Sequence, residues 1–75
     1  MAKISDYDSY TQIVNLKKPH SPSRMLFCTN DPDKWFIRVV EYKNNSGEVS
    51  HTYTIIKSEF EEYKLFCMKS GFCEE

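Results

Sequence analysis

The sequence predicts an α+β fold: one domain, residues 1–75, with a three-stranded antiparallel sheet flanked by an N-terminal and a C-terminal helix (α-β-β-β-α), both helices on one face. Three observations predict it: apolar residues at helical spacing near the N-terminus, three apolar runs separated by turn residues, and helix start and stop signals near the C-terminus. A chain of 75 residues buries only about 60% of the surface that its unfolded form exposes, so we expect a thin core and no deep cleft.

The first helix is expected between Ser5 and Lys18, because apolar side chains recur there at spacings of three and four residues. These side chains are Tyr7, Tyr10, Ile13 and Val14. A strand is the alternative for residues 6–17, since the segment from Tyr10 to Leu16 is also rich in strand formers. Pro19 and Pro22 then prevent a helix from continuing and predict an extended connector.

Three strands are expected next. Residues 24–29 form a short apolar run between turn signals, which is typical of a buried strand. Residues 34–43 and 48–56 are two longer runs joined by Asn44-Asn45-Ser46-Gly47, and they predict a hairpin. A glycine in the left-handed conformation at position 47 would pair Asn44 with Glu48 and so set the register of every later pair.

That register divides the hairpin into two faces. On the first face, expected to meet the helices, Trp35, Ile37 and Val39 lie opposite Ile55 and Tyr53, and the face ends with Glu41 opposite His51. The second face carries Phe36, Arg38, Val40 and Tyr42, and we expect it to be exposed. The alternative is that the N-terminal segment or a homodimer partner covers Phe36 and Val40.

The last helix follows from a capping box and a stop signal. Ser58 and Glu61 have the spacing at which each side chain accepts a hydrogen bond from the other residue's backbone N–H. Gly71 supplies the backbone freedom that closes a helix.

Enzyme chemistry is not expected from this chain. The three cysteines include no CxxC pair, the two histidines lie in no catalytic or zinc-binding motif, and two glycines are too few for a phosphate-binding loop. We therefore expect no catalytic residue, metal or cofactor. Cys67 is expected to be buried and Cys73 exposed as reduced thiols, and a cytoplasmic location is expected because no export signal or membrane-spanning run is found.

The function expected first is a small non-enzymatic binding protein that docks on a larger protein or ribonucleoprotein and inhibits or adapts it, without a membrane. The expected contact residues are Phe36, Arg38, Val40 and Tyr42, with Glu61 and Glu62 as a second, acidic patch. A net charge of −1 fits this role, and eight lysines against two arginines are typical of AT-rich genomes. In general character the chain resembles the viral proteins that bacteriophages make against host defences or host enzymes, including anti-CRISPR inhibitors, which implies a host–virus interaction.

The alternative function is a small RNA-binding module that uses the basic connector and the aromatic sheet face. Its site would contain Lys17, Lys18, Arg24 and Arg38. The expected order of elements resembles the double-stranded RNA-binding domain and the Alu-binding proteins of the signal recognition particle. Where the double-stranded RNA-binding domain presents lysines to phosphates, however, this chain has Ser58-Glu59-Phe60-Glu61-Glu62, and these carboxylates would repel the backbone.

Overall fold

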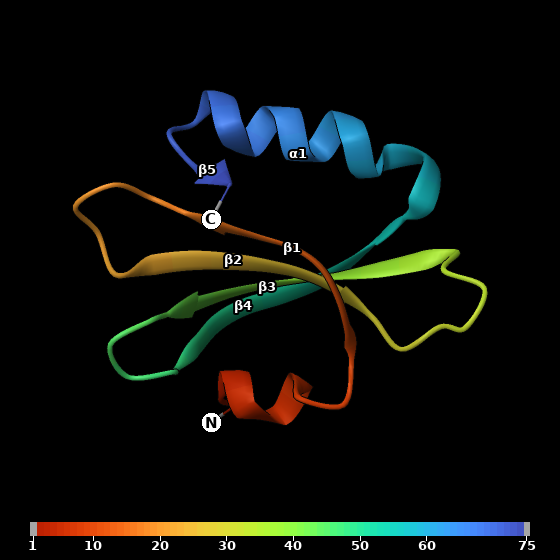
Figure 1. Ribbon diagram of the computed structural model, residues 1–75, viewed down its shortest axis with the longest axis horizontal. Coiled ribbons are helices and arrows are strands. Elements are labelled where there is room, and N and C mark those ends of the chain that lie inside the picture. Colours follow the sequence, from red (N-terminus) through yellow and green to blue (C-terminus); the bar gives the residue numbers. More distant parts are fainter. Residues whose placement is uncertain (1, 75) are drawn as a thin grey trace.

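The computed structural model describes residues 2–74 as a five-stranded antiparallel sheet with strand order β4-β3-β2-β1-β5. The helix α1 crosses one face of this sheet, and the 3-10 helix η1 lies against the other (Figure 1). The elements are η1 (Ile4–Tyr7), β1 (Thr11–Lys17), β2 (Ser23–Thr29), β3 (Phe36–Lys43), β4 (Val49–Ile56), the 3-10 helix η2 (Lys57–Glu59), α1 (Phe60–Lys69) and β5 (Cys73–Glu74). None of the helices in the described residues is long and apolar enough to span a membrane.

The predicted three-stranded sheet with two flanking helices is wrong. The sheet has two further strands, β1 and β5, and one helix of more than a single turn covers it. The N-terminal segment also lies on the opposite face from α1, so the two do not share one face (Figure 1).

The error at the N-terminus has a local cause in β1. Ile13 is an extra residue between the cross-strand pairs that Gln12 and Val14 form with β2, so the strand contains a β-bulge there. A bulge interrupts the alternation of inward and outward side chains, and Tyr10, Ile13 and Val14 consequently show the spacing of a helix. The strand alternative is therefore the correct one for residues 11–17, where β-branched residues favour an extended chain.

The hairpin of β3 and β4 is confirmed, with a correction at its turn. Gly47 has φ of 71°, as the turn requires, but Lys43 rather than Asn44 pairs with Glu48: the Lys43 N–H donates to the Glu48 carbonyl at 2.9 Å. An irregularity near Ser50 then shifts the register by one residue. The predicted pairs farther from the turn, including Glu41 with His51, are formed as a result.

The predicted end of helix α1 is confirmed, but the start of the helix differs from the prediction. Ser58 and Glu61 form no capping box, because η2 occupies the predicted first turn and the caps of η2 and α1 carry no side-chain hydrogen bond. At the other end, Gly71 has φ of 111° and the Phe72 N–H donates to the Cys67 carbonyl at 3.2 Å. The chain can therefore turn back and place Cys73 and Glu74 beside β1.

The sheet has an apolar core on each face. The larger core lies under α1 and comprises Leu16, Met25, Phe27, Ile37, Val39 and Cys67. The smaller core, under η1, comprises Leu26, Cys28 and Val40, which Ile4, Tyr7 and Tyr10 cover in part. The central strands β2 and β3 are consequently buried on both sides, which explains the continuous apolar run of residues 25–28.

Candidate functional site

The second hairpin face is partly covered by η1. Val40 is completely buried there, whereas Phe36 is 57% exposed and Arg38 and Tyr42 are half-buried. The Tyr42 hydroxyl accepts a hydrogen bond of 3.1 Å from the amide of Asn15. Of the four predicted contact residues on the sheet, Phe36 is therefore the most accessible to a partner, and Val40 belongs to the core.

The predicted acidic patch lies elsewhere. Glu61 and Glu62 are exposed in the first turn of α1, on the opposite side of the sheet from Phe36 and Arg38. A negative charge near a helix N-terminus is stabilised by the helix dipole, which is sufficient to explain both carboxylates. The structure does not bring them together with the sheet residues.

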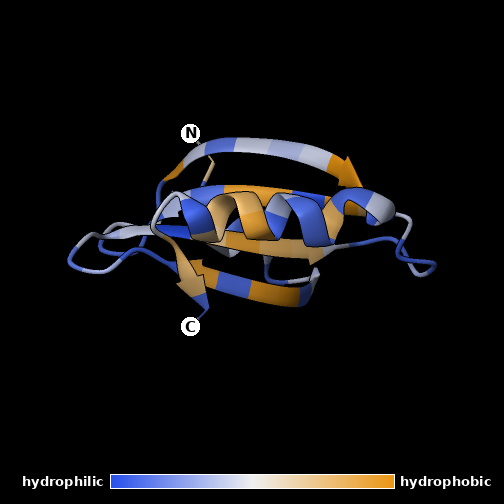
Figure 2. Ribbon diagram, turned by 90° about the horizontal axis from the view of Figure 1, so that it is seen from above, coloured by the Kyte–Doolittle hydropathy of each residue, from blue (hydrophilic) through white to orange (hydrophobic). Residues whose placement is uncertain are grey.

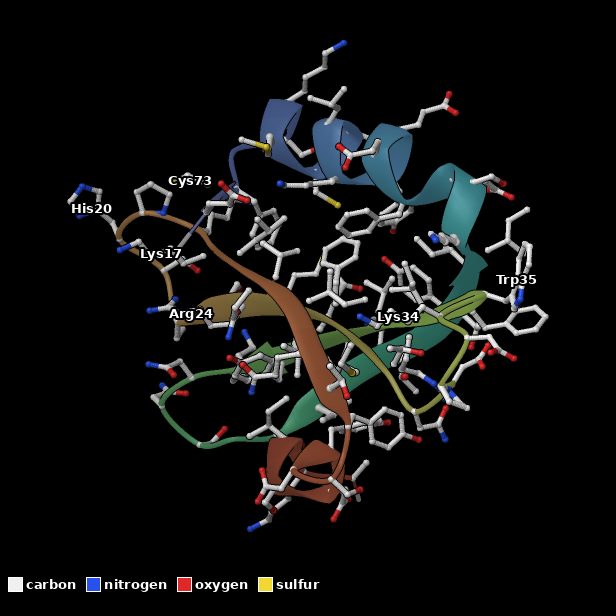
Figure 3. The ribbon with its side chains drawn as sticks, turned by 45° about the vertical axis from the view of Figure 1, so that its right-hand side comes forward. Lys17, His20, Arg24, Lys34, Trp35 and Cys73 are labelled. Atoms are coloured by element: carbon white, nitrogen blue, oxygen red, sulfur yellow. The ribbon has the colours of Figure 1, made fainter. Side chains whose placement is uncertain are left out.

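The basic residues of the RNA-binding alternative fall into two places. Lys17 and Arg24 are cross-strand partners at one end of the sheet, and Lys18 follows directly. Arg24 pairs with Tyr42 on β3, and Arg38 lies four residues before Tyr42 on that strand. Four residues of a strand span about 13 Å, so Arg38 lies well away from Arg24. Figure 3 shows Lys17, His20 and Arg24 at the end opposite to Trp35.

An exposed apolar cluster occupies the end of the sheet where β3 begins and β4 ends. Trp35 is 65% exposed, and Phe36 and Ile56 are cross-strand partners that are also exposed. Trp35 was expected on the face covered by helices, but its side chain extends outward past the start of α1 (Figure 3). Sequence reasoning identified Phe36 and missed the other two; the signal for Trp35 was its position just after the Asp31-Pro32-Asp33 turn, outside the strand.

The strand β4 forms one edge of the sheet, and half of its backbone groups face outward. The Lys57 N–H donates to the Trp35 carbonyl at 2.8 Å, which makes this a hydrogen-bonded pair of the β3–β4 ladder. Because hydrogen-bonded and non-hydrogen-bonded pairs alternate, the N–H groups of Thr52, Thr54 and Ile56 point away from β3. The turn end of the edge is covered by a bridge between Lys3 and Glu48, and beyond it no strand of residues 2–74 lies outside β4.

This open edge is unusually free of protective features. Between Val49 and Ile56 there is no lysine, arginine, carboxylate or proline, the residues with which proteins commonly prevent pairing at an edge strand. Figure 2 shows β4 as the outermost strand on its side, beyond α1 and hydrophobic at the end that leads into η2. A chain of aromatic rings, Tyr53, Tyr63 and Phe66, connects the strand to α1, and Phe66 is 63% exposed.

The other groups that could carry chemistry are one histidine pair and the three cysteines. The imidazole Nδ1 of His51 lies 3.9 Å from a carboxylate oxygen of Glu41, and the His51 side chain is 76% exposed, so this is a solvated cross-strand pair. Burial raises the pKa of the Cys28 and Cys67 thiols, which keeps them protonated, and Cys67 donates to the Met25 sulfur. Cys73 is half-buried, its thiol 3.6 Å from the Lys17 carbonyl, and all three cysteines are free. Among residues 2–74, no three histidine, cysteine or carboxylate side chains converge on a common point where a metal could bind.

Comparison of this chain with protein-family models, with curated proteins and with solved structures finds no match.

Proposed function

We propose that this protein is a non-enzymatic binding protein that docks on a larger protein, inhibiting or adapting it, by taking up an extended segment of that protein as an additional strand beside β4. The single observation that supports this function is the open edge of β4, without a lysine, arginine or carboxylate, between two groups of apolar side chains of which Phe36, Ile56 and Phe66 are exposed. Strand addition is a common way for a folded domain to recognise an extended peptide.

The backbone of β4 would supply part of the binding energy. An antiparallel peptide segment would satisfy the outward N–H groups of Thr52, Thr54 and Ile56 and the carbonyls of the same residues. Each such hydrogen bond contributes only about 1 kcal/mol net, because water is displaced from both partners. Backbone pairing alone therefore gives weak and unselective binding.

Selectivity would come from the side chains on both faces of the added strand. Phe36 and Ile56 lie exposed beside the edge on the η1 face, and Tyr53 and Phe66 lie beside it on the α1 face. Because side chains alternate along a strand, successive residues of the bound segment would contact these two groups in turn. Aromatic side chains dominate the energetics of many protein interfaces, so an apolar, alternating segment is the favoured ligand.

The proposal is tested with two substitutions at one position. Thr54→Pro removes an outward N–H without breaking a hydrogen bond to β3, and Thr54→Ala keeps that N–H. We expect tagged wild-type protein and the alanine variant to retain the same protein partner from a nuclease-treated lysate, and the proline variant to lose it. Circular dichroism and thermal melting establish that all three proteins are folded.

Three results would overturn the proposal. A folded proline variant that retains the partner would show that β4 is not the contact. Recovery of RNA from a lysate without nuclease, with proteins lost after nuclease treatment, would favour the RNA-binding alternative. A dimeric wild-type protein that the proline substitution converts to a monomer would show that a second copy occupies the edge.

A further inference from the structure

A pocket of about 330 Å³ opens at the end of the sheet opposite to Trp35, beside the β1–β2 and β3–β4 turns. Its volume is at the lower end of the range of about 300–1,000 Å³ that is typical of small-molecule sites. Its charged lining residues are Lys18, Arg24, Glu41 and Lys43, and Tyr42, His51 and Phe72 contribute rings.

The residues that line the pocket carry a net positive charge, whereas the whole chain does not. Three cationic residues, Lys18, Arg24 and Lys43, line the pocket together with one acidic residue, Glu41, which leaves an excess of two positive charges. The whole chain carries a net charge of −1, so the excess is a property of this end of the molecule. A concave surface lined by one sign of charge concentrates ligands of the opposite sign.

Arg24 contributes a fixed and incompletely used guanidinium group. Its Nη1 donates to the carbonyls of Ser21 and Ser23, at 2.9 and 3.0 Å, which holds the side chain against the β1–β2 turn. Its Nε is buried and has no hydrogen-bond acceptor among the described residues. Because this Nε atom is buried, an anion in the pocket would interact with the positive charge of the guanidinium group rather than with this donor.

Lys18 and Phe72 form a second wall. The Lys18 ammonium lies 5.6 Å from the centre of the Phe72 ring, which is a cation–π distance. The hydrogen bond from the Phe72 N–H to the Cys67 carbonyl fixes the backbone of Phe72 at the end of α1. The wall therefore combines a positive charge with a flat apolar surface.

We propose that this pocket binds a phosphate monoester whose organic part carries a ring, such as a nucleoside monophosphate. A phosphate monoester carries close to two negative charges at pH 7, which matches the excess of two positive charges in the lining. Its oxygens would accept from Lys18 and Lys43, close to the positive charge of Arg24, and its ring would lie against Phe72. This binding site is at the opposite end of the sheet from Phe36 and Ile56, and it does not depend on the proposed strand addition.

The test is a titration of the ¹⁵N-labelled protein with adenosine monophosphate, inorganic phosphate and adenosine, followed by NMR. We expect saturable shifts at the amides around Lys43 and His51 with the monophosphate, weaker ones with inorganic phosphate, and none with adenosine. Lys43→Gln should weaken monophosphate binding at least tenfold. The matched control Lys69→Gln, an exposed lysine of α1 that does not line the pocket, should change it less than twofold.

Inorganic phosphate that binds as tightly as the monophosphate would overturn the ring contact and hence the proposed ligand class. Equal shifts with adenosine would overturn phosphate recognition. Equal weakening by Lys43→Gln and Lys69→Gln would attribute the binding to overall charge and overturn the site. Because Lys43 is exposed, its substitution should leave the fold intact, and an unchanged NMR spectrum away from the turn verifies this.

Discussion

The hydroxyl of Tyr53 on β4 is hydrogen-bonded to the hydroxyl of Tyr63 on α1, and the two rings meet edge to face with centres 5.7 Å apart. This pair connects the edge strand to the helix that covers the adjoining strands. Burial raises the pKa of both hydroxyl groups, and the hydrogen bond to Tyr63 raises that of Tyr53 further.

A double-mutant cycle should show coupling between these two tyrosines. Tyr53→Phe and Tyr63→Phe should each lower the free energy of unfolding by about 1 kcal/mol, because each leaves one hydroxyl without its partner. The double variant should lose less than the sum of the two, since it removes both polar groups together. Urea denaturation of the four proteins measures this, and strictly additive effects would contradict a coupled pair.

The protein should lose stability at alkaline pH. Burial is the main cause that raises the pKa of four groups: the thiols of Cys28 and Cys67, ordinarily 9.0, and the hydroxyls of Tyr53 and Tyr63, ordinarily 10.0. The pKa of Lys64, ordinarily 10.5, is raised chiefly by its hydrogen bond to Glu74. Above these ordinary values the unfolded chain releases protons that the folded chain keeps, so the free energy of unfolding falls as pH rises. Stability should be nearly constant between pH 7 and 8.5 and should decline from about pH 9 upward.

Each buried thiol should contribute at most about 1.4 kcal/mol per pH unit to this decline in the free energy of unfolding. Urea denaturation at several pH values between 7 and 11 measures the slope. Cys67→Ala should lower stability at pH 7 but reduce the alkaline slope, because one of the groups that drive it is gone. A slope that is the same with and without this thiol would contradict the prediction.

Phe36 and Val40 lie on the same face of β3 but should respond differently to substitution by serine. Val40→Ser should lower the free energy of unfolding by at least about 2 kcal/mol, because it leaves a cavity and a hydroxyl group in the core under η1. Phe36→Ser should cost less than about 1 kcal/mol, since the ring is more than half exposed, but should weaken partner capture. Thermal melting and the capture assay on both variants measure the two effects. Full capture by the Phe36 variant would exclude this side chain from the contact.

Lys34→Gly should stabilise the protein. Lys34 has φ of 59°, a conformation that costs a residue with a Cβ about 1 kcal/mol or more relative to glycine. The expected gain is about 0.5–1 kcal/mol in the free energy of unfolding, less than the full relief because glycine also makes the unfolded chain more flexible. Lys34→Ala is the control: it removes the same charge, retains the strain and should bring no comparable gain. Equal effects of the two substitutions would attribute the change to charge.

The parts of the fold that were predictable are those with strong local signals. Gly47 with its flanking polar residues determines a turn, and alternation along residues 37–41 specifies which side chains share a face. The predicted partners on β4 are correct only because the irregularity near Ser50 offsets the wrong pair at the turn. Gly71 likewise determines where α1 ends. The strand at residues 11–17 was not predictable from periodicity, because the bulge at Ile13 replaces a period of two with the spacing of a helix.

The candidate site was only partly predictable because it depends on which strand has no neighbour. Alternation placed Phe36 and Val40 on the same face, but only the position of η1 buries one and exposes the other. The open edge of β4 follows from the strand order, which no local signal specifies. The pocket lined by Lys18 and Lys43 also depends on two turns that are distant in the sequence.

The strand order also has a consequence for how the molecule assembles. Each strand from β1 to β3 pairs with the next one along the chain, so those contacts close only short loops. Cys73 and Glu74 instead return to β1 across most of the polypeptide, through a strand of two residues. We therefore expect the four-stranded meander to form first and the C-terminal strand to dock last. The last strand would then add to a sheet that has already formed.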